Sequence, residues 1–147
     1  VLEQGPAPNP QAASFDNHRM IRYPYGSAAG YTRMVTEAFS AWDRLWSDLG
    51  TVHFENTGAI AISLEAGDYA QKTLDTFKAV GLPHEVLARD GVEALCPHLS
   101  LPAHAWGVVS FPGGPLFAGR IVADLPNGPQ LTAEALGPFM LGLDTAA

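Results

Sequence analysis

Two arginines stand three residues apart in a short block, residues 14–26, that is rich in aromatic and aliphatic side chains. Arg19 and Arg22 are two of only eight Lys and Arg residues in the chain. A guanidinium is always charged, and its fork of donors fits a carboxylate or phosphate. In a partly dry pocket such hydrogen bonds strengthen. The block therefore predicts an anion site beside a planar ring, unless both arginines only cover the surface with their stems on apolar neighbours.

Composition limits the possible partners. The chain has 147 residues, is 47% hydrophobic and 16% charged, and carries a net charge of −7. This length is enough for one domain with a buried core. The negative charge argues against a nucleic-acid surface, which needs a basic face. We expect a globular domain whose ligand is a small molecule.

The chain's only cysteine, Cys96, excludes an internal disulfide framework and predicts a reducing, cytoplasmic location. No stretch reaches the roughly 18 apolar residues of a membrane span, and the first residues lack a signal-peptide pattern. Cys96, His98 and His104 lie at intervals of two and six residues with prolines between them. Zinc usually takes ligands paired at short, fixed spacings, so we predict no metal site.

Two amphipathic helices are expected to carry the fold. Residues 31–49 place one apolar stripe on a helix that Gly50 ends, with Thr32 on the polar face. The stripe consists of Tyr31, Met34, Val35, Ala38, Trp42, Leu45, Trp46 and Leu49. Residues 68–80 give a second helix, stopped by Gly81 and Pro83.

Shorter segments predict strands and small helices. Residues 52–63 favour a hairpin or bent strand pair about residues 56–58, with His53 as a polar strand position. Residues 84–87 favour a strand, and Asp90 is predicted to cap a helix through Leu95. Residues 105–117 indicate a strand and a tight turn that lead into a helix over residues 118–125. We expect an α+β fold, a mostly antiparallel sheet with helices packed on it.

The run Arg-Met-Ile-Arg-Tyr-Pro-Tyr-Gly at residues 19–26 resembles a block in the sarcosine/glycine oxidases. These enzymes belong to the D-amino-acid-oxidase group of FAD-dependent oxidoreductases. The order of elements over residues 1–125 is similar as well, whereas residues 126–147 match nothing in the family. The resemblance implies that Arg19 lies beside the flavin, that Arg22 grips the substrate carboxylate, and that Tyr25 helps to wall the pocket.

The opening Val-Leu-Glu resembles the end of a strand of the dinucleotide-binding sheet. The resemblance implies that Glu3 holds the ribose of FAD, as an acid does about 20 residues after the glycine-rich loop. The alternative is a solvated carboxylate at a strand end. The loop itself, which forms the pyrophosphate cradle, does not occur in the sequence. We therefore expect a fragment, or one part of a larger assembly, whose first strand is a remnant of that sheet.

The resemblance implies part of an FAD-dependent oxidoreductase that oxidises the C–N bond of a small amino acid or N-methyl amino acid. The isolated chain is expected to be inactive. Two alternatives stay open. The chain can be a non-catalytic domain that has lost flavin binding and holds a carboxylate or a partner, or a subunit whose cofactor site a complementary chain completes.

Overall fold

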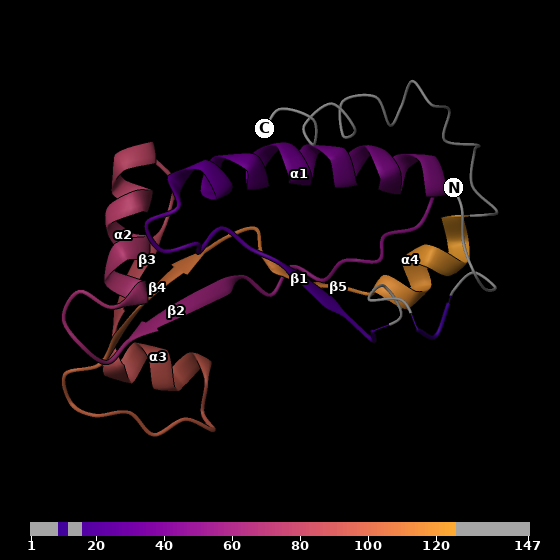
Figure 1. The fold of residues 1–147 in the computed structure, drawn as a ribbon. Coiled ribbons are helices and arrows are strands. Elements are labelled where there is room, and N and C mark those ends of the chain that lie inside the picture. The colour runs from indigo at the N-terminus through magenta and orange to yellow at the C-terminus, as the bar shows by residue number, and fades with distance from the viewer. Residues whose placement is uncertain (1–8, 12–15, 126–147) are drawn as a thin grey trace.

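A computed structural model describes residues 9–11 and 16–125 of the chain. The elements form a long helix, two small antiparallel sheets and three shorter helices (Figure 1). In chain order they are β1 (Arg19–Ile21), α1 (Ala29–Leu49), β2 (Ala59–Ser63), α2 (Tyr69–Val80), β3 (Glu85–Ala88), α3 (Arg89–Leu95), β4 (Trp106–Ser110), β5 (Gly114–Leu116) and α4 (Ala118–Asp124). None of the described helices is long and apolar enough to cross a membrane. The expected α+β class with antiparallel pairing is confirmed, but the strands form two sheets rather than one.

The larger sheet has the order β2-β4-β3, with both pairs antiparallel. One face, with Ala61 and Val108, packs on Leu74 and Phe77 of α2. On the other face, a Cβ added at Gly107 would come within 3.0 Å of side-chain atoms of Ile60 and Val92. Helix α3 therefore lies close against that face because β4 has a glycine there. The sheet is covered by α2 and α3 on opposite sides (Figure 1).

The second sheet joins β1 to β5, with Arg19 opposite Leu116 and Ile21 opposite Gly114. Residues 53–55 run along the other side of β5, because Phe54 forms an isolated bridge with Leu116. Of the two arrangements predicted about residues 56–58, a hairpin or a bent strand pair, the hairpin is therefore wrong, because the segments on either side do not pair with each other. Residues 53–55 pair with β5, and β2 pairs with β4, a partner more than 40 positions further along the chain. Strand β5 was not predicted.

The predicted positions of both long helices are confirmed. Each helix ends at a glycine whose backbone lies in the left-handed region of φ/ψ space. Gly50 has φ 67° and Gly81 has φ 70°, a conformation that glycine adopts without steric cost. The predicted cap at Asp90 is wrong, since the cap position of α3 is Ala88 and Asp90 lies in the first turn. There its carboxylate accepts hydrogen bonds from the Arg89 guanidinium.

The predicted faces of α1 need correction at its first turns. Thr32 is buried, whereas Tyr31 and Met34 are each 61% exposed. The inward stripe consists instead of Val35 and Trp46, with Ala38, Phe39, Trp42, Leu45 and Leu49 partly buried against the core. The helix turns Thr32 inward because its hydroxyl donates to the carbonyl of Tyr23 at 3.2 Å.

Asp68 caps α2 with both carboxylate oxygens. Its Oδ1 accepts from the N–H groups of Ala70 and Gln71, and its Oδ2 accepts from those of Leu64 and Glu65. Burial disfavours the charged form, but the backbone hydrogen bonds and one from the Ser63 side chain outweigh it and lower the pKa of Asp68 to about 2. The carboxylate therefore fixes both the loop before α2 and the helix start.

We expect Asp68→Asn to lower the free energy of unfolding at pH 7 by about 1 kcal/mol, after allowance for solvent screening. Because the folded pKa lies below the unfolded value, this contribution is present above about pH 4 and is lost as the pH falls towards 2. Urea unfolding at pH 7, 4, 3 and 2 measures it. The control is Asp75→Asn, which neutralises an exposed carboxylate that accepts from the Gln71 side chain and from no backbone N–H recorded among the described residues. Equal losses in both variants at every pH would contradict the capping role.

Candidate functional site

Strand β1 and the residues after it present the two arginines on different sides. Successive side chains of a strand point to opposite faces, so Arg19 shares a face with the buried Ile21. Nη1 of Arg22 instead lies 3.9 Å from Sδ of Met20, on the other face. Both arginine side chains are exposed, although Ile21 and Tyr23 beside them are buried, and the two arginines contact different neighbours.

Arg22 lies over an aromatic ring. Its guanidinium carbon is 5.6 Å from the ring centroid of Tyr25, a cation–π arrangement. Its Nε donates to the carbonyl of Pro24 at 3.3 Å. Tyr25 is half-buried and stacks on Tyr31 of α1, with ring centroids 5.5 Å apart. Arg22, Tyr25 and Tyr31 thus form an exposed cation with aromatic backing, which we call the Arg22 platform.

The charge of Arg19 has a partner. Its Nη2 lies 2.8 Å from Oδ2 of Asp16, and both side chains are at least half exposed. The pair is therefore a solvated surface ion pair, which contributes little to stability. Glu3, the residue predicted to hold the ribose, lies outside the described residues.

No described residue with a negative charge pairs with Arg22. Its recorded partners are a backbone carbonyl, a thioether and an aromatic ring. Arg89, by contrast, donates to Asp90 and lies 3.8 Å from Glu93, and these acids raise its pKa. Within the described part of the chain, the Arg22 platform therefore carries a positive charge that no acid balances, and its guanidinium is the donor group that an organic anion needs.

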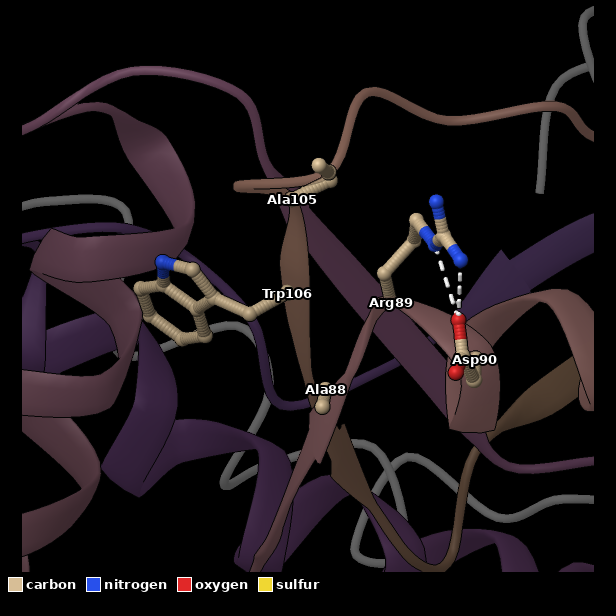
Figure 2. A pocket seen from close by; sticks show the side chains of 6 residues that line it. Ala88, Arg89, Asp90, Ala105 and Trp106 are labelled. Carbon is tan, nitrogen blue, oxygen red and sulfur yellow. Dashed lines mark hydrogen bonds and ion pairs between the residues drawn. The ribbon is translucent and has the colours of Figure 1, made fainter.

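A shallow pocket of about 340 Å³ lies elsewhere, where the end of β3 meets the start of β4. Its lining residues are Ala88, Arg89, Asp90, Ala103, Ala105 and Trp106. Figure 2 shows the Arg89 guanidinium turned onto Asp90, and the Trp106 indole directed away from both. The cation of this pocket is therefore already neutralised, and none of the sequence-predicted site residues lines it.

His53 occupies a position that the sequence assigned to an ordinary polar strand residue. It is 9% exposed, its ring meets that of Trp46 edge-on, and Nε2 lies 2.6 Å from Oδ2 of Asp124. The contact joins the segment after α1 to the end of α4. Its partner is 71 residues away, so no local pattern could have indicated the pair.

The histidines and the cysteine considered for a metal do not form a ligand set in the described part of the chain. No group of three or more His, Cys, Asp or Glu residues there could hold a metal ion. His104 Nε2 lies 2.9 Å from the carbonyl of Leu64, and Cys96 is half-buried with a free thiol. His104 thus tethers the loop before β4 to the end of β2.

Comparison with known proteins gives one family and one fold. The sequence pattern of the family described as FAD dependent oxidoreductase (DAO) matches residues 1–125. No curated protein matches significantly. A fructosyl peptide oxidase from Aspergillus nidulans has a TM-score of 0.62 at 20% identity, over 92% of this chain and 30% of that chain. The open form of NikD, an amino acid oxidase essential for nikkomycin biosynthesis, has a TM-score of 0.60 at 16% identity, over 74% of this chain and 28% of that chain. The chain thus spans under a third of the length of these relatives.

Proposed function

The chain belongs to the family of FAD-dependent oxidoreductases, and from this premise we propose that it carries the substrate-side part of an amino acid oxidase. The complete protein oxidises the C–N bond of a small amino acid or N-methyl amino acid, as sarcosine and glycine oxidases do. FAD, when bound, would accept the hydride. The protein contributes binding, orientation and charge.

One observation carries the proposal, the exposed guanidinium of Arg22 with no negatively charged partner among the described residues. A substrate carboxylate supplies the missing charge, and a bidentate pair fixes its orientation. Tyr25 forms the wall beneath it, because its ring already lies under the guanidinium. We assign substrate binding to Arg22 and Tyr25.

We further propose that the flavin lies at one side of this site. Arg19 is proposed to lie beside the flavin ring, with Asp16 as its present ion-pair partner, and Glu3 to hold the ribose. The remaining contacts, including those to the pyrophosphate, are proposed to come from a complementary chain or from further sequence of a longer protein.

We expect Arg22→Met in the complete oxidase to raise KM for the amino acid about 30- to 100-fold, because a charge-assisted bidentate contact contributes about 2–3 kcal/mol. Steady-state kinetics with sarcosine and glycine measures it. The matched control is Arg33→Met, an exposed arginine of α1, which is expected to leave KM unchanged. A KM for Arg22→Met within twofold of the parent value would refute the assignment.

An absorbance spectrum separates the proposed function from its alternatives. The purified 147-residue chain is expected to be colourless, and to become yellow only when FAD and the rest of the protein are added. A chain that stays colourless with both, yet binds glycine through Arg22, would instead be a non-catalytic carboxylate-binding domain. Flavin bands from the chain alone would contradict the proposal that its site is completed elsewhere.

A further inference from the structure

Two helices hold the residues that follow Arg22. Thr73 Oγ1 accepts from the N–H of Gly26 at 3.1 Å, and Thr76 Oγ1 donates to the Gly26 carbonyl at 2.8 Å, both from α2. Thr32 of α1 donates to the carbonyl of Tyr23. All three threonines are buried. Water does not compete for these hydrogen bonds, because the threonine side chains are buried. The backbone of residues 23–26 is therefore fixed at Tyr23 by α1 and at Gly26 by α2.

Tyr69 reaches the middle of this segment from the first turn of α2. Its hydroxyl donates to the carbonyl oxygen of Pro24, the same oxygen that accepts from Nε of Arg22. A carbonyl oxygen has two lone pairs and can accept both donors. The Tyr69 ring also covers Gly26 so closely that an added Cβ there would lie 3.1 Å from its Cδ2. Tyr69 therefore contacts the segment that orients Arg22 in two ways, through its ring at Gly26 and through its hydroxyl at Pro24.

We propose that Tyr69 is a positioning residue for Arg22, acting through the shared Pro24 carbonyl. The inference rests on the proposed substrate-binding role of Arg22. It adds Tyr69, which lies 47 positions after Arg22 in the sequence, to the residues that form this site. Nε is held by Pro24 and Nη1 contacts the Met20 thioether, which is a weak acceptor, so the two terminal nitrogens can turn to a carboxylate. A bidentate contact tolerates displacements of only about 0.5 Å, and without the Tyr69 hydroxyl the carbonyl loses one of its two anchors. The cap formed by Asp68, the preceding residue, sets where Tyr69 begins the helix.

The test is Tyr69→Phe, which removes the hydroxyl and keeps the half-exposed ring. In the ¹⁵N NMR spectrum of the 147-residue chain, the Nε–H signal of Arg22 is assigned by its loss in Arg22→Met. We expect this signal to shift in Tyr69→Phe and to exchange with water about threefold to tenfold faster, the effect of one hydrogen bond. In the complete oxidase KM is expected to rise by a similar factor at an unchanged kcat.

The matched control is Gln71→Met, which removes a hydrogen bond from the exposed side of the same helix, where Gln71 Nε2 donates to Asp75. It is expected to leave both the Arg22 signal and KM unchanged. An Arg22 Nε–H signal that is the same in Tyr69→Phe and the parent overturns the proposal, as does an equal change in Gln71→Met. If the signal responds but Arg22→Met leaves KM unaltered, the positioning stands and the substrate role of Arg22 fails.

Discussion

Gly114→Ala is expected to lower the free energy of unfolding by about 4 kcal/mol, the sum of backbone strain and overpacking. Gly114 has φ 145°, which side-chain-bearing residues rarely adopt. An added Cβ would lie 2.1 Å from the carbonyl oxygen of Glu55 and 2.9 Å from Oγ1 of Thr57. Because β5 lies between β1 and residues 53–55, the substitution forces apart three segments, including the one that carries both arginines.

Urea denaturation followed by circular dichroism measures the loss. The matched control is Gly119→Ala in α4, where an added Cβ meets nothing within 4 Å. There alanine is the better helix former, and the change is expected to be neutral or to stabilise by about 0.5 kcal/mol. A Gly114→Ala variant as stable as Gly119→Ala would mean that β5 does not pass so close to Glu55.

Phe77→Ala is expected to cost about 3–5 kcal/mol, because it removes a large buried ring and leaves a cavity. Phe77 is completely buried and belongs to the core cluster with Leu74, Ala61 and Val108. Its ring also lies 5.8 Å from that of His84, in the loop before β3. The loss therefore affects the contact between α2 and the sheet, and with it the helix that binds Pro24 and Gly26 next to the Arg22 platform.

The control for Phe77→Ala is Leu95→Ala at the end of α3, where the side chain is 59% exposed. This change is expected to stay within about 0.5 kcal/mol of the parent, since surface substitutions usually do. Thermal melting of both variants under the same conditions gives the comparison. A cost for Phe77→Ala no greater than that of Leu95→Ala would contradict a core centred on α2.

The helices could be predicted from sequence because their signals are local. For both α1 and α2, the periodic apolar residues lie within the helix itself, and the glycine that ends the helix follows directly. Strand β5 has no such signal, because its three residues, Gly-Pro-Leu, become a strand only through partners just over 60 and nearly 100 positions earlier. Thr32 was assigned to the polar face for the same reason, since its acceptor belongs to a segment outside the helix.

The candidate site likewise has a part that the sequence indicates locally and a part that only the fold brings together. Arg22 and Tyr25 are neighbours in sequence, so one short motif indicated both, and the structure brings them together. Tyr69, Thr73 and Thr76 contact this segment from 45 to 50 positions away, through single hydrogen bonds. Tyrosine and threonine in a helix carry no signal of such a contact, because the same residues on a solvated face would give the same pattern.

Strand β2 ends the larger sheet of the described residues, and its composition has a consequence for how that sheet can grow. Its sequence Ala-Ile-Ala-Ile-Ser contains no charge and no proline, the features with which exposed sheet borders usually repel another chain. Among the described residues β2 pairs with β4 alone, so the peptide groups on its other edge would be able to bond a further strand. A strand added at this edge would extend the sheet without rearranging any of the three strands already in place.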